Sequence, residues 1–215
     1  MNNQVISIWK NTGLTSLDVL WTVKKKLNIS KVGHCGTLDP FAEGVLILCT
    51  GKKTKEIDFF MNYEKEYIAT ISLGEETDTL DITGDIVKSK KNKNLKIEKI
   101  QEIIGKYTGD ISQTPPYYSA LKFHGIRLYK YARKGIYIRK KPRKVHIKKI
   151  TFLNLKKNKL SIYVKCEKGT YIRSLARDIA YDLDTYGHLS KLTRIAVGPF
   201  NKKNSLLLGD LCEAS

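Results

Sequence analysis

The sequence predicts an α+β fold, with a mixed, largely antiparallel sheet flanked by helices. Strand and helix patterns are interspersed along the 215 residues without the regular β-α-β alternation of a doubly wound sheet. Two strand patterns, 145–155 and 160–166, are joined by a short lysine- and asparagine-rich turn, which predicts a β-hairpin. Hydrophobic residues make up 41% of the chain and no linker divides it, so we expect one domain over residues 1–215.

The individual elements follow from the spacing of apolar residues. Ser16 is a favourable N-cap for a helix, residues 67–73 alternate as a half-buried strand, and isoleucines recur at helical spacing from residue 97. In the N-terminal half we expect strands at 4–9, 45–49 and 67–73, helices at 17–27, near 53–61 and from 97, and a loop at 88–94. In the C-terminal half we expect a short basic helix near 127–134, the hairpin, a helix ending near 183, a last strand at 189–197 and a helical turn at 206–211.

Positive charge is concentrated in one segment of the chain. The formal net charge is +18. Residues 111–166 contain 16 lysines and arginines and no acidic residue, whereas the remainder carries 23 basic residues against 21 acidic ones. Between Tyr117 and Lys149 aromatic residues alternate with basic ones, which suits base stacking and phosphate contacts. The clustering favours a polyanionic partner, either nucleic acid or an anionic membrane surface, over a general drift toward lysine.

Several classes of protein find no support in the sequence. No apolar run approaches the roughly 20 residues that a membrane helix needs, and the N-terminus lacks the layout of a signal peptide. The four cysteines show no CxxC pair and no zinc-ligand spacing, which is typical of reduced thiols in a cytoplasmic protein. Nucleotide-binding, zinc-protease and serine-hydrolase motifs are absent and the four histidines are isolated, so we expect no metal site.

The stretch around Asp39 combines three glycines (Gly33, Gly36 and Gly44) with a proline directly after the carboxylate. Glycine permits backbone conformations and close approaches that a side chain forbids, and the proline biases Asp39 toward an extended conformation. An apolar strand follows directly. Taken alone, the pattern fits an aspartate that caps a turn, which is the commoner role. It also permits a carboxylate held rigidly at the end of a buried strand.

GHCGTLDPFAEGVL, at 33–46, resembles the catalytic motif of the TruB family of pseudouridine synthases, which modify tRNA. Further motifs similar to those of the family follow in order along nearly the whole chain. KNTGLTS at 10–16 resembles the family's K-P-x-G-x-x-S element without its proline, and KEY at 65–67 resembles the element with the active-site tyrosine. The others are TDTLD at 77–81, YSALK at 118–122, LYKYAR at 128–133, KGTYIR at 168–173 and LTR at 192–194.

The resemblance implies roles for individual residues. Asp39 is the nucleophile, and Arg173 pairs with it and keeps it ionised. Tyr67 stacks on the target base and can transfer a proton, while Asp81 orders the loop around Arg173. The remaining substrate-binding residues that it implies are His34, Tyr171 and Leu192. The residues expected to contact RNA are Lys10, Lys122, Arg127, Lys130 and Arg133.

The implied reaction is isomerisation of the T-loop uridine at tRNA position 55 to pseudouridine, with the uridine flipped out. Whether Asp39 attacks the uracil ring or the ribose stays open. Residues 112–145 form a basic insertion that binds the T-arm, and no C-terminal PUA-type domain is expected, since 15 residues follow Phe200. The resemblance implies no metal or organic cofactor, no obligate protein partner and no membrane, and a cytoplasmic monomer is expected. The alternatives are a synthase that acts on another RNA, such as ribosomal RNA, and an inactive RNA-binding or tRNA-folding factor.

Overall fold

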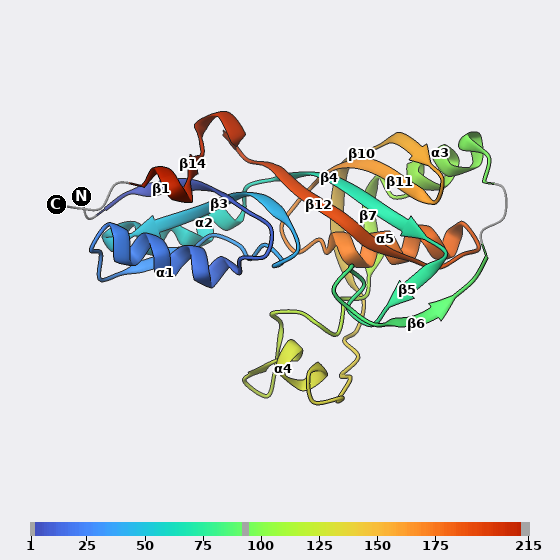
Figure 1. The fold of residues 1–215 in the computed structure, drawn as a ribbon, viewed down its shortest axis with the longest axis horizontal. Helices are drawn as coiled ribbons and strands as arrows, with labels where there is room; N and C mark the ends of the chain where they lie inside the picture. The colour runs from blue at the N-terminus through green and yellow to red at the C-terminus, as the bar shows by residue number, and fades with distance from the viewer. Residues whose placement is uncertain (1–2, 92–94, 212–215) are drawn as a thin grey trace. The chain divides into compact units, whose positions relative to one another are not determined.

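The polypeptide folds as two units, seen in a computed structural model that describes residues 3–91 and 95–211 (Figure 1). The first unit contains Met1–Ile68, Lys165–Lys168 and Lys191–Ser215, and the second contains Ala69–Val164 and Gly169–Ser190. Three strands contribute residues to both units: β4 (Lys65–Leu73), β11 (Lys159–Cys166) and β12 (Gly187–Val197).

The sheet of the first unit has the strand order β14-β1-β3-β12. Its other strands are β1 (Val5–Lys10), β2 (Val32–His34), β3 (Glu43–Thr50), β13 (Phe200–Asn201) and β14 (Leu206–Leu207). β3 pairs antiparallel with β1 and β2, and parallel with β12, whereas β14 pairs parallel with β1. The helices are α1 (Ser16–Lys26), the 3₁₀-helices Gly51–Glu56, Lys202–Asn204 and Leu208–Asp210, and α2 (Ile57–Met61).

The apolar run of β3 is continuous because both faces of this strand are covered. Leu46 and Leu48 point to one face, where they pack with α1. Val45 and Ile47 point to the other, where they join a cluster that includes Phe60 of α2. The period of two along a strand therefore divides the run between two cores, and β3 is held firmly where it leaves the Asp39 loop.

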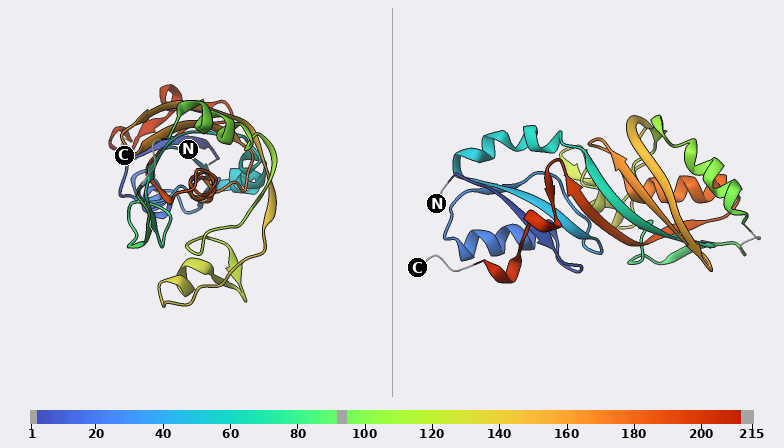
Figure 2. Two further views of the ribbon diagram at one scale, coloured as in Figure 1. Left: turned by 90° about the vertical axis from the view of Figure 1, so that its right-hand side faces the viewer. Right: turned by 90° about the horizontal axis from the view of Figure 1, so that it is seen from above.

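The sheet of the second unit has the order β12-β4-β11-β10-β7. Its further strands are β5 (Glu75–Thr77), β6 (Ile86–Ser89), β7 (Gly109–Gln113), β8 (Lys122–Phe123), β9 (Ile126–Arg127) and β10 (Arg143–Lys156). Its helices are α3 (Ile97–Gly105), α4 (Leu128–Ala132) and α5 (Ile172–Asp182). β5 and β6 form one separate antiparallel pair, and β8 and β9 form another. The segment with α4, coloured yellow-green, loops out from the rest of this unit (Figures 1 and 2).

The expected α+β architecture is confirmed, but the structure differs from the predicted elements in places. Thr15, rather than Ser16, caps α1, because Thr15 and Asp18 form a reciprocal capping box with bonds of 3.0 and 2.7 Å. The helix expected near 53–61 is a 3₁₀-helix followed by α2. Residues 206–207 pair with β1 before the expected helical turn, and β13 and β14 both follow β12. β6 includes the first residues of the loop expected at 88–94, of which 92–94 lie outside the described residues.

Neither a membrane-spanning helix nor a metal-binding cluster is found in the part of the chain that the structure describes. Among the helices of residues 3–91 and 95–211, none is long and apolar enough to cross a lipid bilayer. The same residues contain no group of three or more histidine, cysteine, aspartate or glutamate side chains placed to hold a metal ion.

Candidate active site

The Asp39 loop joins β2 to β3 without regular secondary structure. Asp39 is half-buried, and its backbone carbonyl accepts a hydrogen bond from the Ala42 amide at 3.1 Å, so the residue does begin a turn. Gly44 marks the point where β3 comes close to β12. Its φ is +125°, and a Cβ there would lie 2.2 Å from the backbone oxygen of Arg194. A side chain at this position would push the two strands apart next to the loop.

Lys10, the last residue of β1, holds one side of the Asp39 loop by hydrogen bonds. Its side chain is fully buried. The ammonium donates to the carbonyls of Ala42 at 2.6 Å and Pro40 at 3.4 Å, and to those of Leu14 at 2.7 Å and Asn11 at 3.1 Å. The structure therefore corrects the expectation that Lys10 contacts RNA. A buried ammonium that donates to four backbone carbonyls is a structural clamp, and it holds the two carbonyls on the C-terminal side of Asp39.

Arg194 of β12 holds the other side of the loop. Its Nη1 donates to the Thr37 carbonyl at 3.3 Å and its Nη2 to the Gly36 carbonyl at 3.4 Å, while Nε donates to Val45 at 2.7 Å. The residue is 2% exposed. Sequence reasoning assigned no site role to Arg194, although it ends the LTR motif. The available signal was its place at the end of the LTR motif, within a predicted strand.

Ser16 fixes the residue directly before Asp39. Its hydroxyl accepts from the Leu38 amide at 2.9 Å and donates to the Leu38 carbonyl at 3.2 Å. Together with Lys10 and Arg194, it anchors the backbone on both sides of Asp39 from three different elements. An anchored loop of this kind can present one carboxylate in a fixed geometry, which is what a positioned nucleophile requires.

Burial and neighbouring charges set the protonation of the groups around Asp39. The pKa of Lys10 is lowered to about 8, chiefly by burial and in addition by the positive charge of Arg194, while the carboxylate of Asp39 acts in the opposite direction. Burial raises the pKa of Tyr67, on β4, to about 12. Arg194, which hydrogen-bonds to the Tyr67 side chain, opposes this rise. Tyr67 is therefore protonated at neutral pH and can donate a hydrogen bond or a proton.

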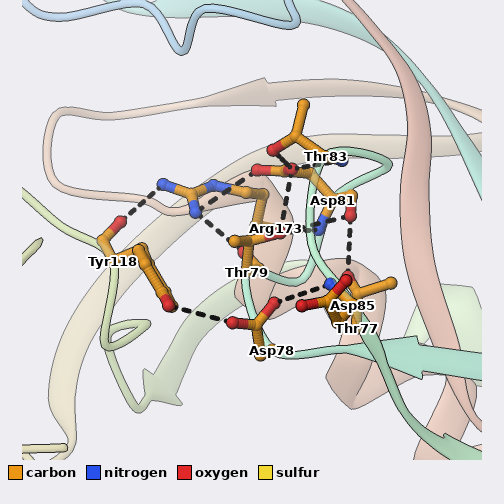
Figure 3. A network of polar contacts seen from close by, with 8 residues as sticks. All are labelled: Thr77, Asp78, Thr79, Asp81, Thr83, Asp85, Tyr118 and Arg173. Carbon is orange, nitrogen blue, oxygen red and sulfur yellow. Dashed lines mark hydrogen bonds and ion pairs between the residues drawn. The ribbon is translucent and has the colours of Figure 1, made fainter. Parts of the chain in front are cut away.

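Arg173 lies in the first turn of α5, in the second unit, and is held by a network of polar contacts (Figure 3). Its Nη1 donates to the Thr79 carbonyl at 2.8 Å and lies 3.5 Å from a carboxylate oxygen of Asp81. Its Nη2 donates to the carbonyl of Tyr118 at 2.8 Å. Asp81 in turn accepts from the Thr83 amide at 3.0 Å. The loop at 77–81 thus orients the guanidinium, which is buried together with Asp81.

Tyr171 is the N-cap residue of α5, directly before the helix. Its backbone amide donates to Oε1 of Gln113 at 2.8 Å, and the guanidinium of Arg143 lies 5.3 Å from the centre of its ring. Sequence reasoning did not select Gln113 or Arg143. They become neighbours of Tyr171 because β7 and β10 pair with Gln113 opposite Arg143, a long-range register that no local pattern reveals.

The predicted site residues are divided between the two units. Asp39 and Tyr67 lie in the first unit, near each other and near Lys10 and Arg194. His34, half-buried on β2, and Leu192, buried on β12, belong to the same unit. Arg173 and Tyr171 belong to the second unit. The pairing of Arg173 with Asp39 stays a prediction.

The expected RNA-contact residues other than Lys10 are exposed in the segment 112–145 of the second unit. They are Lys122, Arg127, Lys130 and Arg133. Two basic groups of this segment lie over aromatic rings: Arg133 is 5.3 Å from the ring centre of Tyr129, and Lys140 is 4.7 Å from that of Phe123. Cationic groups next to aromatic faces can serve both phosphates and unstacked bases.

The loop anchored around Asp39 and the exposed basic residues of 112–145 are compatible with an enzyme that acts on a nucleic acid, and comparison with known proteins identifies its family. Residues 24–172 match the family model of the TruB family pseudouridylate synthases, N-terminal domain. The chain is 46% identical over 211 residues to tRNA pseudouridine synthase B of Clostridioides difficile, which covers 97% of this chain and 70% of the relative. It is also 46% identical over 214 residues to the enzyme of the same name from Francisella philomiragia, covering 99% of this chain and 71% of the relative.

Two solved structures are similar to this chain in both fold and sequence. One is a Cbf5–Nop10–Gar1 complex, with a TM-score of 0.75 and 31% identity over 96% of this chain. Another is an H/ACA RNP bound to a substrate RNA containing 2′-deoxyuridine, with a TM-score of 0.71 and 28% identity. This chain covers 53% and 51% of the matched chains in these structures, about half of their length. The chain is a pseudouridine synthase, an isomerase. It belongs to the TruB family.

Proposed function

We propose that this chain converts the T-loop uridine at tRNA position 55 to pseudouridine, with Asp39 as the nucleophile on a flipped-out uridine. The proposal is carried by one observation, the anchoring of the backbone on both sides of Asp39 by Lys10, Arg194 and Ser16. Family membership supports the reaction class, and the names of the relatives support tRNA as the substrate.

The chemistry needs groups that this chain can supply. The bond between N1 of uracil and C1′ of ribose breaks, a bond from C5 to C1′ forms, C5 loses a proton and N1 gains one. Because the product is an isomer of the substrate, the balance requires no oxidant, reductant or donor of atoms. Asp39 forms the covalent intermediate, at the uracil ring or at the ribose. The ring of Tyr67 stacks on the base. Because its pKa is raised to about 12, its hydroxyl keeps its proton at neutral pH and can take part in proton transfer.

The remaining residues bind and orient the uridine in this proposal. Arg173 pairs with Asp39, while Tyr171 and Leu192 line the pocket and His34 contacts the RNA. The exposed basic residues of 112–145 bind the T-arm phosphates. The enzyme acts as a monomer, in the cytoplasm, where its tRNA substrate is found.

Incubation with unmodified tRNA and, in parallel, with unmodified ribosomal RNA, followed by chemical mapping of pseudouridine, tests the proposal. The expected product is a single pseudouridine in the T-loop, and a tRNA with cytidine at that position should stay unmodified. Product confined to ribosomal RNA would instead indicate a synthase of another specificity. Bound tRNA without any product would indicate an RNA-binding factor.

Asp39→Asn tests the nucleophile. The amide cannot attack, so product should fall to background while tRNA affinity changes little. Asp58→Asn, an exposed carboxylate in the first turn of α2, is the matched control and should behave as the parent. Turnover by Asp39→Asn near the parent level would refute the assignment.

A further inference from the structure

The start of the basic insertion is held against α5 by a row of hydrogen bonds. Gln113 accepts from the Tyr171 amide at 2.8 Å, and the Thr114 carbonyl accepts from the Ser174 hydroxyl at 2.9 Å. The Tyr118 carbonyl accepts from Arg173 at 2.8 Å. The chain therefore enters the insertion along the same helical turn that carries Arg173.

Tyr118 makes a second contact, through its side chain. Its hydroxyl donates to Oδ2 of Asp78 at 2.9 Å, as Figure 3 shows. The other oxygen of this carboxylate accepts from the Asp85 amide at 3.0 Å, so both oxygens of Asp78 are engaged. Gly84 packs against it closely, since a Cβ there would lie 2.2 Å from Oδ1. Asp78 is thus a fixed acceptor for the Tyr118 hydroxyl.

These contacts form a closed ring of polar interactions that links Arg173, the 77–81 loop and Tyr118. Asp78 belongs to the same loop, 77–81, whose Thr79 carbonyl and Asp81 carboxylate bind Arg173. Tyr118 joins that loop through its hydroxyl and joins Arg173 through its carbonyl. If the backbone of the insertion moved at Tyr118, the Arg173 guanidinium would lose one hydrogen-bond acceptor. The 77–81 loop would lose the hydrogen bond donated to Asp78. The acceptor is a carboxylate oxygen and the bond lies in a half-buried site, which makes it stronger than a bond between neutral groups on the surface.

We propose that Tyr118 and Asp78 are positioning residues for the isomerisation, which couple the RNA-binding insertion to the orientation of Arg173. The inference rests on the proposed function, because it concerns the rate of that reaction. In this arrangement the insertion does more than supply positive charge, since its first residues complete the set of acceptors around the arginine.

Tyr118→Phe tests the inference, because it removes one oxygen atom and keeps the ring. Tyr107→Phe is a matched control. Tyr107 is also half-buried in the second unit, and its hydroxyl donates to Oδ2 of Asp182, also at 2.9 Å. Burial and the partner carboxylate raise the pKa of both tyrosines above the ordinary value. Each variant therefore removes a bond from a tyrosine hydroxyl to a carboxylate, which is half-buried for Tyr118 and exposed for Tyr107. Of the two tyrosines, only Tyr118 hydrogen-bonds to Arg173.

The measurements are the single-turnover rate constant at saturating enzyme, the tRNA dissociation constant and the melting temperature. Tyr118→Phe should slow the single-turnover step by about tenfold or more with the dissociation constant nearly unchanged. Tyr107→Phe should keep the parent rate, and its melting temperature should fall by no more than that of Tyr118→Phe, because its bond is more exposed. Equal slowing of both variants would overturn the inference, as would a parent rate for Tyr118→Phe, or weaker binding without a slower step.

Asp78→Asn gives a second route if Tyr118→Phe folds poorly. The amide keeps one acceptor oxygen for the Asp85 amide, and its NH2 group then faces the Tyr118 hydroxyl. The hydroxyl can no longer donate to a carboxylate oxygen and instead accepts a weaker, neutral hydrogen bond. The variant should be slowed similarly, and the double variant should be no slower than the slower single variant. Additive slowing would show that the residues act independently and would overturn the inference. Absence of T-loop product with the parent enzyme would refute the proposed function instead, so the two failures are distinguishable.

Discussion

Lys10 sits at the base of the proposed nucleophile's loop with its side chain fully buried. Burying an ammonium is costly unless its donors are satisfied, and here four backbone carbonyls accept from it. The remaining cost appears as a pKa lowered to about 8, chiefly by burial. The residue stabilises the loop by its hydrogen bonds and destabilises the fold by its desolvated charge.

The balance at Lys10 predicts a specific pH dependence of stability. Its pKa is about 8 in the folded chain and close to the ordinary 10.5 in the unfolded chain. Between these values the unfolded chain binds more protons, so the free energy of unfolding contributed by Lys10 should rise as pH increases from about 8 toward 10.5. Below pH 8 Lys10 is charged in both the folded and the unfolded chain, so the free-energy cost of burying its charge is present in full.

Urea unfolding of the parent and of Lys10→Met from pH 7 to 10.5 measures this contribution. The difference in unfolding free energy, parent minus variant, should increase over that interval. Lys52→Met, an exposed lysine of the same unit, should give a flat difference. A flat or decreasing difference for Lys10→Met would contradict the assignment.

At the scale of elements, α1 has two functions at its first turn. The capping box of Thr15 and Asp18 begins the helix, whereas Ser16 reaches out to Leu38 of the Asp39 loop. Adjacent residues therefore serve the helix and the site separately, which allows the two functions to be tested with similar substitutions.

Thr15→Ala and Ser16→Ala should have different effects. Loss of the cap should lower the unfolding free energy by about 1 kcal/mol and leave the rate close to the parent's. Loss of the Ser16 hydroxyl leaves the buried Leu38 amide without that partner, at a cost of about 1–3 kcal/mol, and loosens the residue before Asp39. We therefore expect Ser16→Ala to lower the single-turnover rate as well as stability. Equal rates for the two variants, measured alongside urea unfolding, would contradict this division.

At the scale of the whole molecule, the motif residues are divided between two units and the positive charge is concentrated in one of them. We propose that the two units act as one catalytic domain over residues 1–215 and that 112–145 is its RNA-binding insertion. This proposal predicts that the salt dependence of tRNA binding resides in the insertion.

Neutralising Lys122, Lys130 and Arg133 to glutamine should make the plot of log affinity against log salt shallower, by about 0.9 for each phosphate that is no longer neutralised. The control neutralises Lys156, Lys157 and Lys159, which are exposed at the β10–β11 turn within the same basic segment. The control removes the same charge, so its slope should stay near the parent's. Equal slopes for the two variants would show that general charge, rather than the insertion, binds the RNA.

The predictable parts of this fold are those with local causes. The run at 45–49 predicted a strand because apolar residues on both faces suit a strand with two covered faces, and the isoleucines from 97 predicted α3 by their helical spacing. The parts that failed depend on contacts between distant segments. Serine is a common N-cap residue, but the Ser16 hydroxyl instead hydrogen-bonds to the backbone of Leu38. Lysine is usually a surface residue, but Lys10 is buried.

The sequence by itself determined the family, because the motifs occur in order along the chain, and with the family it determined Asp39 as the candidate nucleophile. Only the tertiary structure decided which side chains hold that aspartate's loop and which hold Arg173. Lys10, Ser16 and Arg194 lie 29, 23 and 155 residues from Asp39 in the sequence. Hydrogen bonds across such separations form only after strands pair and helices pack, so no local pattern of residues predicts them.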